Sequence, residues 1–118
     1  MTRKEIKELD ALWSKKVKEL AKYRCEHCKE PGRQLVHDGA WLNSAHIIGR
    51  RYRGTRWSIT NGMCLCYSCH RQWDEHGPQH EDILRRVIGR ERLNVLIRMA
   101  KHKVTKYQDY DTIKRNLI

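Results

Sequence analysis

The strongest constraint on the fold of this chain comes from two pairs of cysteines, each with two residues between its members. Cys25 and Cys28 form the first pair, and Cys66 and Cys69 form the second. Two such pairs can place four thiolates around one tetrahedral ion, and a closed set of four sulfur ligands is typical of structural zinc. The spacing therefore predicts a Zn²⁺ site of the treble-clef kind, with a knuckle at the first pair and a helix start at the second.

The fifth cysteine, Cys64, makes the count odd. An odd count without an export signal disfavours a disulfide framework and favours metal binding in a reducing compartment. Buried free thiols are the simpler alternative, and for Cys64 we expect that outcome. Cys64 could also replace Cys66 as a ligand, but only Cys66 has the two-residue spacing to Cys69.

The size and apolar content of the chain make such a metal useful. The chain has 118 residues, only 39% of them hydrophobic, and no Phe. A small domain with so little aliphatic material often needs a metal to stabilise its core. We expect one domain over residues 1–118, with an N-terminal helix in 1–24, a zinc-bearing core in 25–77 and C-terminal helices in 78–118.

The pattern of apolar residues predicts an α+β fold, a small ββα centre wrapped by helices. Residues 3–23 have apolar positions at steps of three and four, and Thr2 to Glu5 has the form of a capping box. The other expected elements are strands at 34–37 and 41–47 around an Asp38-Gly39 turn, a loop at 48–60, a strand at 62–65, a helix at 67–76 ended by Gly77-Pro78, helices at 81–88 and 91–102, and a last helix after Thr105.

The charge of the chain indicates its class of partner. There are 25 Lys and Arg residues against 14 Asp and Glu, a net charge of +11. Such an excess favours a polyanion, either nucleic acid or an anionic membrane surface. The N-terminal MTRKEIKELD lacks the apolar core of a signal peptide, and no apolar run is long enough to cross a bilayer. We therefore expect a nucleic-acid partner, no membrane and a cytoplasmic location.

Four arginines lie close together in the predicted loop, at Arg50, Arg51, Arg53 and Arg56. Guanidinium forks suit bidentate contact with phosphate. Contacts of this kind position a duplex and carry little sequence information. We predict that these arginines contact DNA, and the alternative is a solvated run of surface charge.

Three further polar residues accompany the cysteine pairs in a fixed order. The sequence A-H-I places His46 between the pairs, and N-G-M-C-L-C-Y-S-C-H places Asn61 before the second pair and His70 directly after it. From Cys25 to about His76, this pattern resembles the zinc-bearing, phage-type HNH endonucleases. The resemblance implies a ββα-metal fold in which His46 ends the first strand of the hairpin, Asn61 lies where the loop meets the second strand, and His70 lies in the first turn of the helix.

The resemblance also implies catalytic roles for these residues. His46 would be the general base, Asn61 would hold its imidazole by a hydrogen bond, and His70 would ligate Mg²⁺ or Mn²⁺. An imidazole titrates near neutral pH and suits proton abstraction, while a divalent ion can stabilise the charge of the phosphate and of the leaving oxygen. Taken singly, the three also have ordinary explanations: a hydrogen-bonded strand histidine, a turn, and a substitute zinc ligand.

One position departs from the family pattern. Many HNH nucleases have a metal-ligating side chain just before the general base, and this chain has Ala45 there. Asp74 is four residues after His70, which places both on one face of a helix. Its carboxylate would suit Mg²⁺ or Mn²⁺, although a solvated helix residue is an equally open explanation. His37, Ser44 and His76 are weaker candidates.

The function predicted from these features is a metal-dependent endonuclease that nicks or cuts duplex DNA, in a bacterial or phage-infected host cell. The first alternative is a catalytically inactive, zinc-stapled nucleic-acid-binding module in which Ala45 marks a lost metal site. The second is a protein-interaction treble clef whose charge only aids solubility. His46 and Asn61 favour the enzyme, because a binding module has no use for a general base.

Overall fold

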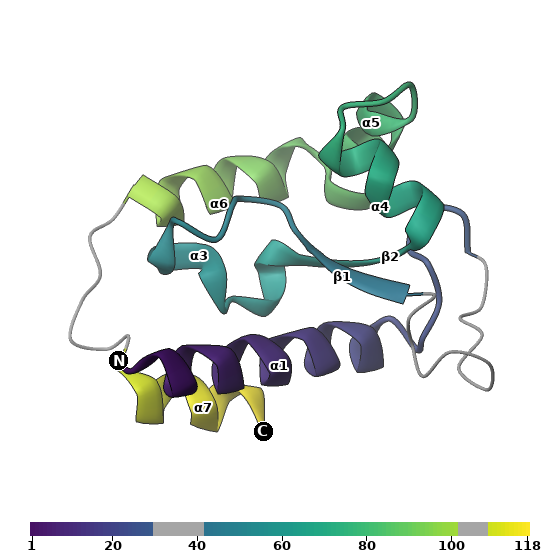
Figure 1. The fold of residues 1–118 in the computed structure, drawn as a ribbon. Helices are drawn as coiled ribbons and strands as arrows, with labels where there is room; N and C mark the ends of the chain where they lie inside the picture. The colour runs from purple at the N-terminus through teal and green to yellow at the C-terminus, as the bar shows by residue number, and fades with distance from the viewer. Residues whose placement is uncertain (30–41, 102–108) are drawn as a thin grey trace.

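A two-stranded antiparallel sheet lies at the centre of the molecule. The computed structural model describes residues 1–29, 42–101 and 109–118. Strand β1 (Leu42–His46) pairs with β2 (Gly62–Cys66), with Leu42 opposite Cys66 and His46 opposite Gly62. Helix α1 runs along one side of this sheet, and α4, α5 and α6 lie on the other side (Figure 1). The fold is α+β, as the sequence predicted.

Helix α1 (Arg3–Leu20) begins at the predicted capping box. The Glu5 carboxylate accepts a hydrogen bond from the Thr2 backbone N–H at 2.8 Å, and the Thr2 hydroxyl accepts one from the Glu5 N–H at 3.1 Å. The helix ends earlier than the predicted residue 23, because Lys22 and Tyr23 have left-handed backbone conformations with φ of 55°. Its buried residues are Leu9, Trp13 and Val17.

The strand predicted at 41–47 is observed as β1. In the described part of the chain its partner is β2, so His46 ends the first strand of the hairpin as the family resemblance implied. The strand expected at 34–37, the Asp38-Gly39 turn and His37 lie outside the described residues.

The segment predicted as a loop at 48–60 contains two short helical turns. These are α3 (Arg53–Arg56) and the 3₁₀ turn η1 (Ile59–Asn61). Thr55 is fully buried and Trp57 is 6% exposed, so this segment packs into the core. Buried backbone groups need hydrogen-bond partners, and the helical turns supply them locally. The glycines and arginines of this segment predicted a loop, and they did not indicate that it packs into the core.

In the described residues after β2 the chain is mostly helical. Its elements there are α4 (Tyr67–Asp74), α5 (His80–Ile83) with its π-helical continuation η2 (Leu84–Ile88), α6 (Arg90–Lys101) and α7 (Tyr110–Leu117). Helix α4 ends two residues before the predicted His76, which has φ of 51°. Gly89, with φ of 79°, separates η2 from α6 as expected. Helix α7 lies against α1, where Lys114 forms an ion pair with Glu8 at 3.0 Å.

Gly62, the first residue of β2, allows α1 to pack closely on the sheet. A Cβ atom at Gly62 would lie 2.4 Å from Cγ2 of Val17 and 2.8 Å from Cζ2 of Trp13. Both distances are shorter than real carbon contacts, and both neighbours are buried. The absence of a side chain at Gly62 therefore sets the distance between α1 and β2.

We predict that Gly62→Ala lowers the free energy of unfolding by about 1–3 kcal/mol, because the added methyl group overpacks this contact. Chemical denaturation followed by circular dichroism measures the change. Gly49→Ala is the matched control, since a Cβ atom there would meet nothing within 4 Å. Equal stability of the two variants would contradict the packing role of Gly62.

Candidate functional site

The four cysteines of the two predicted pairs meet in one cluster. The Sγ atoms of Cys25, Cys28, Cys66 and Cys69 all lie within 4.8 Å of one another. The Sγ atoms of Cys28 and Cys66 are 3.8 Å apart. A tetrahedral ion with metal–sulfur bonds of about 2.3 Å separates its ligands by about 3.8 Å. The geometry of the cluster thus fits a metal ion such as zinc.

Local backbone structure prepares these thiols for a metal. The N–H of Cys28 donates to Sγ of Cys25 at 3.5 Å, and the N–H of Cys69 donates to Sγ of Cys66, the N-cap of α4, at 3.5 Å. Burial disfavours the Cys25 thiolate, but backbone hydrogen bonds outweigh it and hold the pKa of Cys25 below its ordinary value. Burial raises the pKa of Cys69, and a cation bound at the cluster would favour its thiolate form.

Cys64 lies outside this cluster of four, as predicted. It is fully buried, and burial raises the pKa of its thiol to about 12. A thiol with so high a pKa remains neutral and behaves as a small apolar side chain. Cys66, rather than Cys64, belongs to the cluster of four cysteines that could hold a metal.

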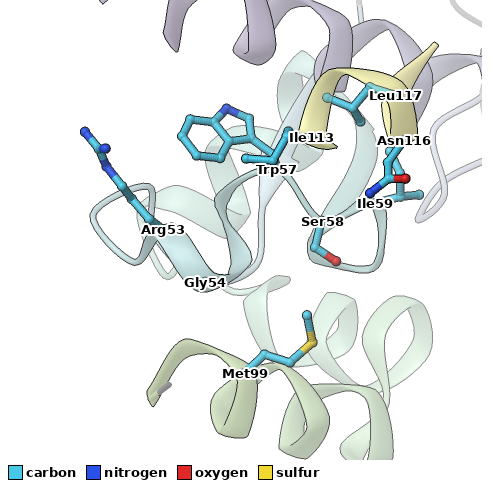
Figure 2. Close-up of a pocket in the computed structure, with 9 residues that line it drawn as sticks. All are labelled: Arg53, Gly54, Trp57, Ser58, Ile59, Met99, Ile113, Asn116 and Leu117. Carbon is cyan, nitrogen blue, oxygen red and sulfur yellow. The ribbon is translucent and has the colours of Figure 1, made fainter. Parts of the chain in front are cut away.

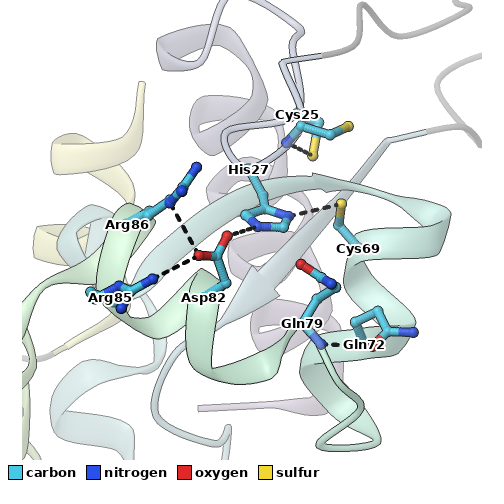
Figure 3. A network of polar contacts seen from close by, with 9 residues as sticks. Cys25, His27, Cys69, Gln72, Gln79, Asp82, Arg85 and Arg86 are labelled. Atoms are coloured by element: carbon cyan, nitrogen blue, oxygen red, sulfur yellow. Dashed lines mark hydrogen bonds and ion pairs between the residues drawn. The ribbon is translucent and has the colours of Figure 1, made fainter.

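A histidine and an aspartate connect the cysteine cluster to α5 (Figure 3). His27 Nδ1 lies 3.3 Å from Sγ of Cys69, and His27 Nε2 lies 2.7 Å from Oδ2 of Asp82. Arg85 and Arg86 contact the other carboxylate oxygen of Asp82 at 3.2 and 3.1 Å. Neither residue was predicted from the sequence, although the position of His27 inside the first cysteine pair was a usable signal.

His46 lies in a cavity of about 480 Å³ that it shares with His70 and Asp74 of α4. Its ring is stacked on the indole of Trp13, with ring centroids 3.9 Å apart and planes inclined by 12°. His46 Nε2 lies 3.1 Å from the backbone oxygen of Arg56. Since a carbonyl oxygen only accepts hydrogen bonds, Nε2 carries the proton, and in the neutral ring Nδ1 has the free lone pair.

The surroundings of His46 favour its neutral form. Burial of the imidazole lowers its pKa below the ordinary value, and the positive charges of Arg50 and Arg56 act in the same direction. The hydrogen bond to the Arg56 carbonyl and the negative charge of Asp10 oppose the shift in part. A neutral ring with a lone pair on Nδ1 has the form that a general base requires.

Asn61 lies before β2, as expected, but its side chain forms its hydrogen bonds with the backbone of Ile48 and not with the imidazole. It is fully buried, its Nδ2 donates to the Ile48 carbonyl at 3.0 Å, and its Oδ1 accepts from the Ile48 N–H at 2.8 Å. The predicted hydrogen bond between Asn61 and His46 is therefore wrong. Asn61 closes the loop between β1 and β2 instead, and the backbone of Arg56 within that loop holds the imidazole.

His70 lies in the first turn of α4, and its Nε2 is 3.2 Å from Oδ2 of Asp74. The His70 side chain is 27% exposed and that of Asp74 is 61% exposed, so both are open to solvent at the cavity. One imidazole nitrogen and one carboxylate, with water and phosphate oxygens completing the coordination, form a donor set that Mg²⁺ or Mn²⁺ accepts. The residues present thus fit such an ion.

Ala45, the departure from the family pattern, faces away from this cavity. It is 1% exposed, whereas the flanking Ser44 and His46 both line the cavity. Successive side chains of a strand point to opposite faces, which accounts for the difference. A ligating side chain at position 45 of this strand would be buried in the core.

The four arginines of the loop do not form one cluster. Arg50 lines the His46 cavity, and the guanidinium of Arg51 lies 4.7 Å from the ring centroid of Tyr52. Arg53 borders a second cavity of about 320 Å³, next to Trp57 and Met99, and its guanidinium points away from that cavity (Figure 2). These three residues are exposed to solvent.

The fourth arginine, Arg56, is directed into the molecule. Its Nε and one Nη lie 3.1 and 2.7 Å from the two carboxylate oxygens of Asp10 in α1. The Arg56 side chain is only 17% exposed. Its predicted contact with phosphate is thus replaced by a bidentate ion pair. Asp10 was not singled out from the sequence.

Comparison with known proteins gives the class of this site. The family model described as HNH endonuclease matches residues 25–77. That range contains the cysteine cluster together with His46, Asn61, His70 and Asp74. Over residues 25–77 the chain is therefore similar to the HNH endonuclease family, and this similarity suggests a nuclease in general terms.

No curated protein and no solved structure matches the chain at a significant level. Among the described residues, no helix is long and apolar enough to cross a bilayer.

We predict that Asp82→Ala loosens the metal at the cysteine cluster, because His27 loses the partner that holds its ring against Cys69. Removal of a group that orients a metal ligand typically lowers the metal affinity by about 10-fold or more. The rate of metal transfer to a chromophoric chelator measures the effect. Glu81→Ala, an exposed neighbour on α5, is the control. Equal transfer rates for the two variants would exclude a role of Asp82 at the cluster.

Proposed function

We propose that the chain is a metal-dependent DNA endonuclease that hydrolyses phosphodiester bonds and nicks or cuts duplex DNA. In this proposal His46 is the general base, His70 and Asp74 hold Mg²⁺ or Mn²⁺, and the four cysteines hold a structural Zn²⁺. One observation carries the proposal above all: within a segment of the HNH endonuclease family, His46 shares a cavity with His70 and Asp74.

The protonation state of His46 supports its role as a base. Its Nδ1 has a lone pair and takes a proton from the attacking water, while the Nε2–H remains bonded to the Arg56 carbonyl. That hydrogen bond becomes charge-assisted when the ring is protonated, which stabilises the imidazolium formed. The stacked indole of Trp13 restricts rotation of the ring.

The same cavity contains the proposed metal ligands. A divalent ion bound by His70 and Asp74 would polarise the phosphate and neutralise the leaving oxygen. Magnesium commonly binds through one or two protein ligands and keeps waters that substrate oxygens replace. The solvent exposure of both side chains supports access for a phosphate.

Charge around the cavity supports duplex DNA as the substrate. Arg50 lines the cavity, while Arg51 and Arg53 are exposed on the same loop. The chain carries a net charge of +11. Contacts between arginines and phosphates are independent of base sequence and weaken as salt increases. We therefore expect low sequence preference and binding that depends strongly on ionic strength.

The competing proposal is a catalytically inactive, zinc-stapled nucleic-acid-binding module. Ala45 favours it, because this position offers no ligand atom and is buried. Both proposals require the cysteine cluster and a basic surface. They differ only in whether His46 and the proposed metal ligands carry out chemistry.

We predict that the wild-type chain relaxes or linearises supercoiled plasmid in Mg²⁺ or Mn²⁺, and that His46→Ala lowers the rate by at least about 100-fold, the usual contribution of a general base. Gel electrophoresis of plasmid forms measures the rate. His76→Ala is the control, since this exposed histidine does not line the His46 cavity. DNA binding without cleavage in either ion would favour the binding module.

We predict that Asp74→Ala raises the Mg²⁺ concentration needed for half-maximal cleavage by about 10-fold or more, because one charged oxygen ligand is lost. A metal titration at fixed DNA concentration measures the shift. Glu75→Ala removes the neighbouring exposed carboxylate, which pairs with Arg71 at 3.4 Å. If both variants keep the wild-type requirement, Asp74 is not a ligand.

A further inference from the structure

Helix α1 lies outside the segment that matches the HNH family, yet it contacts the candidate site at several points. The indole Nε1–H of Trp13 donates to the Ser58 carbonyl at 2.8 Å. Asp10 accepts hydrogen bonds from the side chains of Arg56 and Trp57. Three consecutive residues of the loop between β1 and β2, at 56–58, are therefore fixed to α1.

Asp10 is arranged to hold one backbone group in particular. Its carboxylate accepts from Nε of Arg56 at 3.1 Å, from Nη2 of Arg56 at 2.7 Å and from Nε1 of Trp57 at 2.9 Å. The Arg56 side chain thus forms a fork-to-fork pair, the most directional contact that arginine makes. The carbonyl of this same residue accepts the hydrogen bond from His46 Nε2.

Trp13 holds the other side of the imidazole. Its indole is 2% exposed and lies face to face with the His46 ring, with centroids 3.9 Å apart. The bond to Ser58 fixes the indole edge, and Gly62 leaves room for the indole beside β2. His46 is therefore held on its face by a residue of α1 and at its edge by a carbonyl that α1 fixes.

We propose that Asp10 and Trp13 are positioning residues for the general base, so that α1 completes the active site that residues 25–77 begin. This inference rests on the proposed function and names the residues that prepare His46 for it. Asp10 lines the same cavity as His46. Both of its carboxylate oxygens accept hydrogen bonds from the side chains of Arg56 or Trp57, so Asp10 acts on the imidazole through Arg56.

The charges around His46 determine in which direction the pH–rate profile should move when Asp10 is replaced. Arg50 and Arg56 lower the pKa of His46, and Asp10 raises it. His70 and Asp74 of α4 line the same cavity. When Asp10 loses its charge, one of the two influences that raise the pKa of His46 is removed, so this pKa falls further. A general base is active in its deprotonated form, which predominates above its pKa. The acidic limb of the pH–rate profile therefore moves to lower pH.

The test is Asp10→Asn, which keeps the shape of the side chain and removes its charge. We expect kcat to fall by about 10- to 100-fold, the usual effect of misplacing a catalytic group, with little change in KM for plasmid DNA. The acidic limb of the pH profile should move to lower pH. Glu19→Gln is the control, because it removes one carboxylate from the same helix, 43% exposed and 4.0 Å from Lys15.

A second variant tests the same contact from the other side. Arg56→Lys keeps the positive charge and loses the planar fork, so we expect a similar fall in kcat. In the double variant the loss should be no greater than that of the more affected single variant, since both remove one interaction. Losses that multiply would show that the two residues act independently and would overturn the proposal.

A spectroscopic measurement tests the positioning role of Asp10 independently of nuclease activity. Nitrogen-15 NMR of the His46 ring should show the Nε2–H tautomer in the wild type and a mixture of tautomers in Asp10→Asn. If the wild type does not cut DNA but this change occurs, the proposed function fails and the positioning role stands. If the tautomers are unchanged in Asp10→Asn, the positioning role is overturned. A higher Mg²⁺ requirement for cleavage would then indicate that Asp10 is a metal ligand. A lower stability alone would indicate that its role is structural.

Discussion

The close packing of α1 on the first residue of β2 is the contact on which the rest of the site depends. Because Gly62 has no side chain, Val17 and Trp13 lie directly against the strand backbone. That approach places the Trp13 indole over His46 and brings Asp10 within reach of Arg56. This contact in the core thus determines the geometry of the half-buried imidazole of His46, the residue that pairs with Gly62 across the sheet.

Helix α4 joins the metal cluster to the candidate catalytic cavity. Its N-cap and first turn contribute Cys66 and Cys69 to the cluster, and the next residues along the helix contribute His70 and Asp74 to the cavity. A metal ion such as zinc would therefore fix the start of the helix that presents the proposed ligands. The His27–Asp82 contact extends this support to α5.

Features that depend on neighbouring residues in the chain were predicted from the sequence, whereas contacts between distant residues were not. The capping box at Thr2, the two cysteine pairs and the four-residue spacing of His70 and Asp74 depend on neighbours in the chain, and each appears as expected. The Asp10–Arg56 pair joins residues 46 positions apart. An arginine that binds a carboxylate has the same chemistry as one that binds phosphate, so composition could not separate the two. Asn61 was expected beside the imidazole, but its amide matches the paired donor and acceptor of one backbone residue, Ile48.

The dependence of His46 on α1 limits how this nuclease module can be moved between proteins. The segment that matches the family begins at residue 25, but the indole and the carboxylate that set the imidazole come from residues 10 and 13. A chimera made from the matched segment alone would carry the proposed general base without the side chains of α1 that contact it or its partner Arg56. The transferable unit is therefore larger than the recognisable one, and it begins at the capping box of α1.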